Sequence, residues 1–333
     1  MKKERIFVFK TKPTIISHAA VVGKKEGEGP MGKEFDYIFE DSKAGQDSWE
    51  QSESRIHREA VTRAIKKSGY KNEDIDMIIS GDLLDQCTGT AFSIKDLGIP
   101  FTGVYGACST MALSMLVAAT MTEAKLCTNT VAATSSHFCS AEKQFRMPLE
   151  YGGQRPPTAQ WTATASGAVV VSDKGKGVKI TSGLIGTIQD MGITDANNMG
   201  AAMAPAACDT ISKYLKGTKT KPSDYDMILT GDLGVVGTEL LLELLEKQES
   251  IDISGVHNDC GLMIYDLNEQ DVNSGGSGCG CSGAVVCSNI LRRMEEGELK
   301  KILFIGTGAL LSAVSPLQSE PVPGIAHLVC LEA

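Results

Sequence analysis

A nine-residue pattern occurs twice in this chain, and the two copies are 150 residues apart. The first copy runs from Ile75 to Leu83 (IDMIISGDL) and the second from Tyr225 to Leu233 (YDMILTGDL). Each copy follows a helical segment and a short acidic turn, and each continues into another helix-like stretch. A duplicated unit of about 150 residues therefore accounts for most of the chain. Strands that alternate with helices in this way form mainly parallel sheets that are buried on both faces.

Two shorter similarities support the duplication. They pair Ser166–Ser172 with Ser282–Ser288 and, more weakly, Val131–Ser135 with Phe304–Gly308. Because duplicated halves pack about a pseudo-twofold axis, corresponding strand ends are expected to meet. The predicted fold class is α/β, with an N-terminal half at residues 1–178 and a C-terminal half at residues 179–333.

Three elements of the first half are readable from local patterns. Thr14–Val22 predicts a strand, and the glycine-rich, polar segment Gly23–Gly32 predicts a loop. Trp49–Lys67 has apolar residues at helical spacing, which indicates an amphipathic helix.

The composition is typical of a globular protein with enough apolar residues for a large core, since 42% of residues are hydrophobic and 22% are charged. The net charge of −9 argues against a nucleic-acid partner, because phosphate binding needs a basic surface. No run approaches the ~20 apolar residues that span a bilayer, and Ile6–Phe9 is too short for a signal peptide. The ten cysteines predict reduced thiols in the cytoplasm, where we expect the chain to be made.

One cysteine follows a strand-like run and precedes a helix-like one. Ile99–Val104 is apolar, Cys108 comes four residues later, and the small apolar residues Met111–Ala119 predict a buried helix. A helix N-terminus has unpaired N–H groups and a partial positive charge, which favour a thiolate. Cys108 is therefore a candidate site residue, and a buried structural cysteine is the alternative.

The second copy of the repeat is followed by His257, Asn258, Asp259 and Cys260. Ligands of α/β sheets bind beyond the carboxyl ends of strands. The symmetry of the two halves therefore predicts that His257 is a neighbour of Cys108.

A group of polar residues, Ser135, Ser136 and His137, ends another strand-like run. Hydroxyl and imidazole groups at a strand end suit the recognition of a carboxylate or a carbonyl. The alternative is an ordinary turn with a capping serine.

The glycine-rich segment Gly275–Gly283 lacks the downstream acidic residue of a nucleotide-binding loop. Its glycines are expected to let the backbone approach another segment closely. The spacing of Cys260, Cys279 and Cys281 is not that of a zinc site, so no metal site is predicted.

Four charged residues have interpretations that need no ligand. Asp82 and Asp232 occupy equivalent strand ends and are expected to be turn or cap residues. Arg146 and Arg155 lie in a long polar segment; they are candidate anion-binding residues, and solvated surface arginines are the alternative.

The duplicated halves and the cysteine at the strand–helix bend resemble the thiolase superfamily, which includes β-ketoacyl-ACP synthases, thiolases and HMG-CoA synthases. The resemblance implies a five-layer αβαβα structure, with Cys108 at the position of the acyl acceptor and His257 at that of a catalytic partner. The third catalytic position falls near Cys279, where these enzymes have histidine or asparagine. The absence of either residue argues against decarboxylative condensation.

Motifs along essentially the whole chain are similar to those of the stage V sporulation protein AD family. They are Gly81–Leu84, Phe101–Thr110, Ala132–His137, Gln144–Arg146, Glu150–Gln154, Ala202–Ala207, His257–Tyr265 and Gly306–Ser312. This resemblance implies a non-enzymatic protein that binds dipicolinic acid (pyridine-2,6-dicarboxylate), with or without its calcium, and has no other cofactor. It also implies a role in loading the developing spore and in release at germination, with the other SpoVA membrane proteins as partners and a peripheral location on the inner membrane of the forespore and spore.

A pocket derived from an acyl-thioester site offers N–H donors for carboxylates and an apolar slot for a flat ring. The residues expected to bind the ligand are Cys108, Ser135, Ser136, His137, His257, Asn258, Cys279 and Gly308. The alternative function is an acyltransferase or condensing enzyme that uses Cys108 and His257, and a third alternative is a scaffold with a vestigial pocket. Superfamily members are commonly dimers joined through edge strands, so we expect a homodimer in which the strand ending near Ser135 takes part.

Overall fold

The computed structural model describes residues 6–145, 155–315 and 318–333. Its strands are β1 (Phe7–Val8), β2 (Thr14–Gly23), β3 (Tyr37–Phe39), β4 (Met77–Gly81), β5 (Phe101–Gly103), β6 (Asn129–Ser136), β7 (Trp161–Thr162), β8 (Ala165–Ser172), β9 (Val178–Leu184), β10 (Met227–Thr230), β11 (His257–Asp259), β12 (Gly276–Ser277), β13 (Lys301–Ala309) and β14 (Gly324–Glu332). Its α-helices are α1 (Lys24–Gly27), α2 (Trp49–Ser68), α3 (Thr88–Ile94), α4 (Thr110–Glu123), α5 (Phe138–Phe145), α6 (Met199–Thr218), α7 (Gly234–Leu244), α8 (Cys260–Met263), α9 (Cys279–Val285) and α10 (Leu291–Glu295).

The strands of the two halves follow the same spatial order. The N-terminal strands are arranged β5-β4-β6-β8-β2 and the C-terminal strands β11-β10-β13-β14-β9, and the two sets join where β2 pairs with β9. The repeated segments Ile75–Leu83 and Tyr225–Leu233 contain the corresponding strands β4 and β10. The match of Ser166–Ser172 with Ser282–Ser288 is wrong, because the first segment belongs to β8 and the second to α9 and the π-helix Val286–Ile290. The strand that corresponds to β8 is β14.

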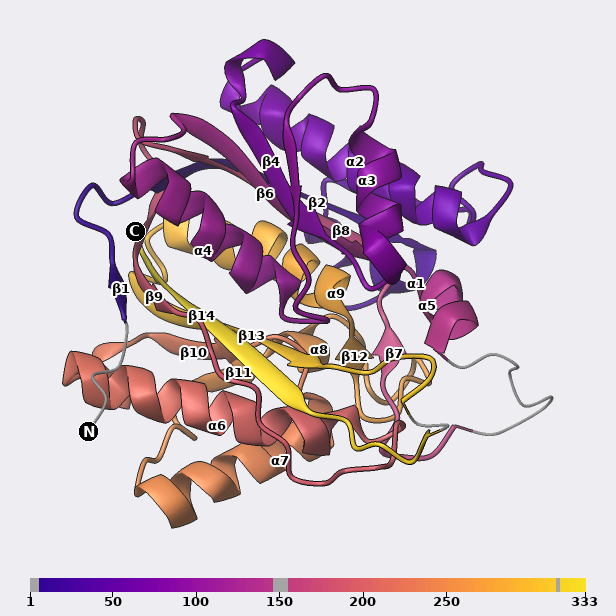
Figure 1. Ribbon diagram of the computed structural model, residues 1–333, viewed down its shortest axis with the longest axis vertical. Helices are drawn as coiled ribbons and strands as arrows, with labels where there is room; N and C mark the ends of the chain where they lie inside the picture. Colours follow the sequence, from indigo (N-terminus) through magenta and orange to yellow (C-terminus); the bar gives the residue numbers. More distant parts are fainter. Residues whose placement is uncertain (1–5, 146–154, 316–317) are drawn as a thin grey trace.

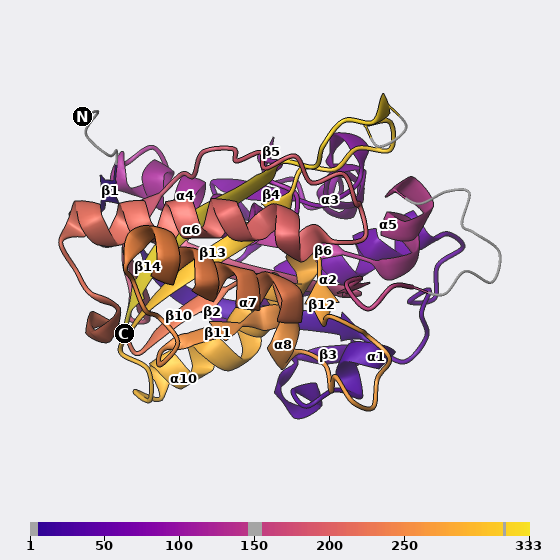
Figure 2. The ribbon, with the colours of Figure 1, turned by 90° about the horizontal axis from the view of Figure 1, so that it is seen from below.

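The helices form three layers around the two half-sheets, as Figures 1 and 2 show. In the middle layer, α4 packs on β4 and β6 of one half and on β13 and β14 of the other, and α9 lies beside it against β8 and β6. The outer layers are α2 with α3 on the N-terminal half and α6 with α7 on the C-terminal half. This five-layer αβαβα arrangement confirms the predicted fold class.

The two long helices of the N-terminal half show why these segments fold as they do. The helix predicted at Trp49–Lys67 is confirmed as α2; Ser48 and Gln51 form its N-terminal capping box, and Gly69 ends it in the left-handed conformation at φ 80°. By contrast, α4 buries small apolar side chains all around its axis, as expected for a helix enclosed between two sheets. The loop predicted at Gly23–Gly32 is only partly correct, because its first residues form α1.

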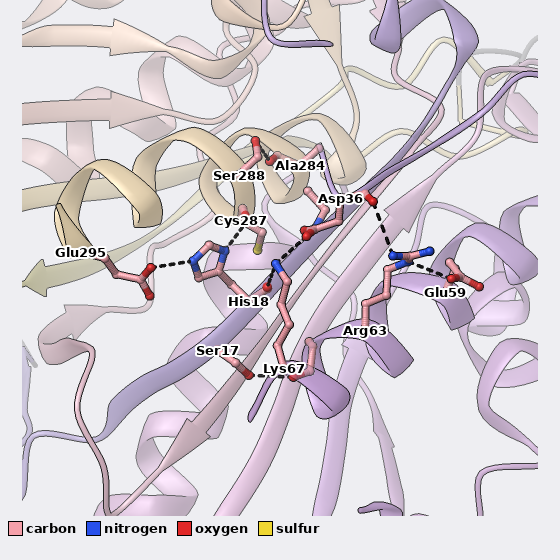
Figure 3. Close-up of polar contacts among 12 residues, drawn as sticks. Ser17, His18, Asp36, Glu59, Arg63, Lys67, Ala284, Cys287, Ser288 and Glu295 are labelled. Carbon is pink, nitrogen blue, oxygen red and sulfur yellow. Dashed lines mark hydrogen bonds and ion pairs between the residues drawn. The ribbon is translucent and has the colours of Figure 1, made fainter. Parts of the chain in front are cut away.

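Polar contacts tie β2 to the C-terminal half (Figure 3). The Nδ1 atom of His18 lies 2.5 Å from the carbonyl oxygen of Cys287, and its Nε2 lies 3.4 Å from Oε2 of Glu295. The His18 side chain holds the pKa of Glu295 below its usual value. On the other side of β2, Lys67 pairs with Asp36 at 2.5 Å and donates to the main-chain carbonyl of His18 at 3.0 Å. The two contacts of the His18 side chain join the halves, whereas those of Lys67 hold α2 against β2 within the N-terminal half.

The strand that ends at Ser136 does not lie at a sheet edge. β6 is hydrogen-bonded to β4 on one side and to β8 on the other. The expectation that this strand joins two subunits is therefore wrong, since it has no free edge. Within the part of the chain that the structure describes, β5 and β11 end the main strand order, and the short strands β1 and β3 pair only with β9 and β2.

None of the described helices is both long and apolar enough to cross a bilayer. All ten cysteines lie in the described ranges; they are free, and Cys139 alone among them is not buried.

Candidate binding site

Cys108 lies in a sharp turn between β5 and α4. Ala107, just before it, has a φ of 49°, in the left-handed region that residues with a side chain rarely adopt. Two hydroxyl groups hold the turn: Ser109 Oγ donates to the carbonyl of Gly106 at 2.5 Å, and Thr110 Oγ1 donates to that of Ala107 at 2.6 Å. The turn places Cys108 at the N-terminus of the central helix α4, as the sequence predicts.

The thiol of Cys108 points into the protein and is 5% exposed. The carboxyl group of Asp232, which comes from the C-terminal half, lies near it and acts on it electrostatically. Asp232 also accepts hydrogen bonds from Thr307 Oγ1 at 2.7 Å, from the main-chain N–H of Gly278 at 2.8 Å and from Ser277 Oγ at 3.3 Å. Burial, followed by the charge of Asp232, raises the pKa of the Cys108 thiol well above its usual value. The thiol is therefore neutral near pH 7.

Burial also raises the pKa of Asp232 itself, against the hydrogen bonds that it accepts. The expectation of a turn or cap role holds for Asp82, whose carboxyl accepts the N–H groups of Leu84 and Thr90 at 2.8 and 2.7 Å. For Asp232 it is wrong, because this side chain binds Thr307 on β13 and the loop before α9. The sequence signal that could have found Asp232 is its place at the end of the repeated strand.

A cavity of about 40 Å³ lies at Cys108. It is lined by Leu83, Tyr105, Ala107, Cys108, Ala141, Glu142, Phe145, Thr162, Met199, Ser277, Ala309 and Leu311. Most of these side chains are apolar, and the hydroxyl groups of Thr162 and Ser277 add hydrogen-bond donors. Of these residues only Cys108 is among the predicted ligand-binding residues, since most of the others are apolar and carry no local signal of a site.

Two other predicted site residues lie beside Cys108. Gly308 on β13 passes so close that a Cβ atom there would lie 2.4 Å from the carbonyl oxygen of Gly106 and 3.3 Å from the nitrogen of Cys108. Cys279, the first residue of α9, packs in the same small apolar cluster as Cys108 and donates its thiol to the carbonyl of Ser135 at 2.9 Å. Burial raises the pKa of Cys279 as well. The close approach expected of the glycine-rich segment is confirmed at Gly280, where a Cβ would lie 2.3 Å from the carbonyl oxygen of Ala165.

Ser135, Ser136 and His137 are buried, and none of them lines the Cys108 cavity. Their side chains contact, in order, the carboxyl of Glu53 at 3.2 Å, the carbonyl of Ala163 at 2.6 Å and the carbonyl of Ser42 at 2.9 Å. Burial lowers the pKa of His137. These residues therefore hold the end of β6 and the start of α5 in place.

His257 and Asn258 lie on the edge strand β11. The Nε2 atom of His257 is 3.0 Å from Thr230 Oγ1, and burial lowers the pKa of its imidazole to about 4. Asn258 accepts the N–H of Asp259 at 2.8 Å. Within the described ranges no contact joins His257 to Cys108, and neither His257 nor Asn258 lines the cavity. The reason is topological. Helix α4 precedes β6, and helix α9 precedes the corresponding strand β13. Helix α9 is therefore the counterpart of α4, and its start lies opposite Cys108.

Arg155, one of the two candidate anion-binding arginines, does not line the cavity at Cys108. Arg155 packs over the ring of Trp161 at 4.6 Å and donates to the carbonyl of Asp271 at 2.8 Å. Arg146 and the motif at Glu150–Gln154 lie outside the described residues. Among the residues that are described, no group of three or more His, Cys, Asp or Glu side chains is arranged to hold a metal ion.

Residues 3–332 match the model of a protein family described as stage V sporulation protein AD (SpoVAD). The chain is 42% identical over 329 residues to the stage V sporulation protein AD of Bacillus subtilis (strain 168), and the match covers 99% of this chain and 97% of that protein.

Solved structures of similar fold include condensing enzymes. The 3-oxoacyl-[acyl-carrier-protein] synthase III of Aquifex aeolicus VF5 is 12% identical with a TM-score of 0.57, over 96% of this chain and 100% of that one. Cerulenin-bound OleA of Xanthomonas campestris is 12% identical with a TM-score of 0.64, over 98% and 100% of the two chains. At such low identity these likenesses show the fold, which is thiolase-like. The match over nearly its whole length shows that the chain belongs to the stage V sporulation protein AD family.

Proposed function

We propose that this protein binds dipicolinic acid, as the free acid or as its calcium chelate, in the cavity at Cys108 and catalyses no reaction on it. The observation that carries the proposal is the burial of Cys108 near the carboxyl group of Asp232, since both raise the pKa of its thiol. Nucleophilic cysteines need a base or a positive environment that produces a thiolate, whereas this thiol faces a carboxyl group in a buried site. The position of a nucleophile is kept, and its chemistry favours holding a ligand.

The lining of the cavity suits a small aromatic acid. Leu83, Phe145 and Met199 offer apolar contact for a ring. The hydroxyl groups of Thr162 and Ser277, together with the N-terminus of α4, offer donors and partial positive charge for a carboxylate.

The charge of Asp232 favours the calcium chelate over the free dianion. Asp232 lies near Cys108, and a carboxylate repels a dianionic ligand in a poorly solvated site. Calcium neutralises the two carboxylates of dipicolinate, so we expect tighter binding when calcium is present.

Titration calorimetry with dipicolinate, with and without calcium chloride, tests this function. Calcium chloride alone and benzoate with calcium serve as controls for the metal and for a single carboxylate. We expect saturable binding of one dipicolinate per chain, strengthened by calcium. If no binding heat is seen under either condition, the proposed function is wrong, and the protein is better described as a scaffold with a vestigial pocket.

The cellular part of the proposal follows from family membership. The protein would act peripherally on the inner membrane of the forespore and spore with the other SpoVA membrane proteins, and would support uptake of dipicolinic acid and its release at germination. Membrane fractionation of sporulating cells, with and without the other SpoVA proteins, tests this. We expect the chain in the membrane fraction only when those partners are made.

Acyl transfer at Cys108 is the alternative function, and the strained turn at Ala107 favours it because it presents the cysteine at a helix N-terminus. Incubation with acyl-CoA followed by mass spectrometry of the Cys108 peptide tests it. We expect no acylated Cys108, and a stoichiometric acyl adduct would make the protein an enzyme.

A homodimer joined through β5 is also part of the proposal. This edge strand and the turn after it expose Phe101 and Tyr105, and Phe92 on α3 is 61% exposed. An unpaired edge with exposed aromatic side chains is suited to pairing with a second copy of the same strand.

A further inference from the structure

The short helix α5 forms one wall of the Cys108 cavity. Its Ala141 and Phe145 pack with Leu83, Cys108 and Cys279 in an apolar cluster that is separate from the larger cores. The cavity of about 40 Å³ between them has room for roughly three water molecules. No ligand that contains an aromatic ring can therefore enter unless a wall of the cavity moves.

The surroundings of α5 make it the wall that can move. A hollow of about 550 Å³ adjoins its start at His137–Cys139, and another of about 230 Å³ adjoins Ser140, Lys143 and Gln144. Together with the Cys108 cavity, these hollows place open space at three positions along α5, which is only eight residues long. Protein interiors are otherwise close-packed, so apolar packing holds α5 less firmly than its neighbours.

The two ends of α5 are held differently. At the first residue, the ring of Phe138 stacks on that of Trp161 with centroids 3.8 Å apart, and the N–H of Phe138 donates to Thr164 Oγ1 at 3.2 Å. Towards the other end, the contacts to the N-terminal half are polar and near the surface: Lys143 pairs with Glu50 at 2.6 Å, and Gln144 accepts the N–H of Asp85 at 3.0 Å and donates to the carbonyl of Leu83 at 3.3 Å. Polar contacts that water can replace contribute little to stability. A movement of α5 would therefore pivot near Phe138.

The buried polar contact of α5 joins Ser140 to Glu53 of α2. Ser140 Oγ lies 2.6 Å from Glu53 Oε2 and also donates to the carbonyl of His137 at 3.1 Å, while Glu53 Oε1 accepts from Ser135 at 3.2 Å. A neutral Glu53 that carries its proton on Oε2 satisfies every one of these groups, since it donates to Ser140, which in turn donates to His137.

The neighbours of Glu53 favour this neutral form. Asp82 and Glu53 flank Gly89 so closely that a Cβ on Gly89 would lie 3.2 Å from Glu53 Oε1 and 3.3 Å from Asp82 Cγ. Burial, followed by the Asp82 charge, raises the pKa of Glu53 to about 8, and Glu50 on the same helix acts in the same direction. The remaining groups that face it are the hydroxyls of Ser135 and Ser140 and the thiol of Cys279.

We propose that α5 is a lid over the Cys108 cavity, latched shut by the hydrogen bond between a neutral Glu53 and Ser140. Ionised Glu53 would place two buried carboxylates side by side, and an outward movement of α5 relieves this cost by admitting water to them. The lid therefore opens more often in alkaline solution.

The reactivity of Cys108 towards iodoacetamide in the ligand-free protein tests the lid, because α5 covers this thiol. Peptide mass spectrometry separates Cys108 from the other cysteines. We expect Ser140→Ala to increase the rate at least about tenfold, which corresponds to the loss of one hydrogen bond to a carboxyl group. Ser288→Ala removes a buried serine hydrogen bond of 2.6 Å in a helix that does not contact α5, and it should leave the rate unchanged. Equal rates in Ser140→Ala and the wild type would overturn the proposal.

Glu53→Gln tests the latch without removing a hydrogen bond. Its amide donates to Ser140 and accepts from Ser135 as the neutral acid does, but it does not ionise. The ratio of the wild-type rate to the Glu53→Gln rate should rise between pH 7 and pH 9, because only the wild type loses its latch as Glu53 ionises. The ionisation of Cys108 itself affects both rates and cancels in this ratio. A constant ratio would overturn the latch. No dipicolinate is needed for either test, so their failure is separate from failure of the proposed function.

Discussion

The carboxyl group of Asp232, in the C-terminal half of the chain, lies near the thiol of Cys108, in the N-terminal half, and its charge raises the pKa of that thiol. Asp232 stands where the repeated strand of the second half ends, and Cys108 stands at the start of the central helix of the first half. A buried thiol that faces a carboxyl group is held neutral, and this relationship separates the site from one that is built to form a thiolate.

Removal of the Asp232 charge should make Cys108 more acidic. In Asp232→Asn the carbonyl oxygen still accepts a hydrogen bond, but the coulombic contribution that raises the pKa of Cys108 is absent. We expect the pH profile of Cys108 alkylation to move to lower pH. Asp226→Asn, which alters a carboxyl that binds the N–H groups of Lys300 and Lys301, is the control and should leave the profile in place. An identical profile in all three proteins would show that Asp232 does not control the thiol.

Stability should fall as pH rises from about 6.5 to 8. The pKa of Glu53 is raised to about 8 and that of Asp259 to about 7, in both cases chiefly by burial. The folded protein therefore holds protons that the unfolded chain has already lost above about pH 4.5, and each such group costs about 1 kcal/mol per pH unit until its folded pKa is passed. Urea unfolding at half-unit steps measures this slope, and Glu53→Gln should make it shallower. A stability that is constant or rises over this interval would contradict the assignment.

Below pH 6.5 the buried histidines should oppose this slope. Burial lowers the pKa of His57 to about 3 and that of His327 to about 4. The unfolded chain binds protons at these side chains first as the pH falls, so each histidine contributes a loss of stability on acidification from about pH 6.5 to 4. His57→Gln should remove its share of this loss in the same urea series. An unchanged pH dependence below 6.5 in this variant would show that His57 does not contribute.

The close passage of β13 over the Cys108 turn predicts a sharp effect of one methyl group. Gly308→Ala would place a Cβ 2.4 Å from the Gly106 carbonyl oxygen, so backbone must move, and we expect a loss of about 1–3 kcal/mol in the free energy of unfolding. Gly255→Ala is the control, because nothing lies within 4 Å of a Cβ there. Thermal unfolding of the two variants makes the comparison. Equal melting temperatures would mean that β13 does not constrain the turn.

A charge on the free edge of β5 should prevent self-association. Tyr105, just after the strand, is 46% exposed, and a lysine there would bring like charges together in a symmetric pair. Leu126→Lys changes a residue that is 72% exposed outside β5 and serves as the control. Sedimentation equilibrium should show a dimer for the wild type and for Leu126→Lys and a monomer for Tyr105→Lys. A wild-type monomer would refute the proposed dimer.

Local patterns were sufficient to predict the elements around the site but not all of their pairings. The repeated strands, helix α2 and the turn at Cys108 follow from residue types within a few positions of each other. The match of Ser166–Ser172 with Ser282–Ser288 fails because SGAVVVS and SGAVVCS are short apolar runs without helical or strand periodicity, so tertiary packing decides that the first is a strand and the second a helix.

The prediction that His257 is a neighbour of Cys108 follows from the position of His257 after the second copy of the repeat, whereas the counterpart of α4 is α9. The approach of Asp232 to Cys108 and the hydrogen bond between Ser135 and Glu53 join residues more than 80 positions apart. No pattern within a short window of the sequence reveals such contacts.

The most direct test of the account is a calorimetric titration of dipicolinate, in the presence of calcium, into the wild type, Cys108→Ala and Cys108→Phe. Alanine removes the thiol and keeps the space, whereas phenylalanine fills the cavity of about 40 Å³. We predict an affinity within about threefold of the wild type for Cys108→Ala and a loss of at least about tenfold for Cys108→Phe. The same affinity in all three folded proteins would show that the ligand does not bind at Cys108.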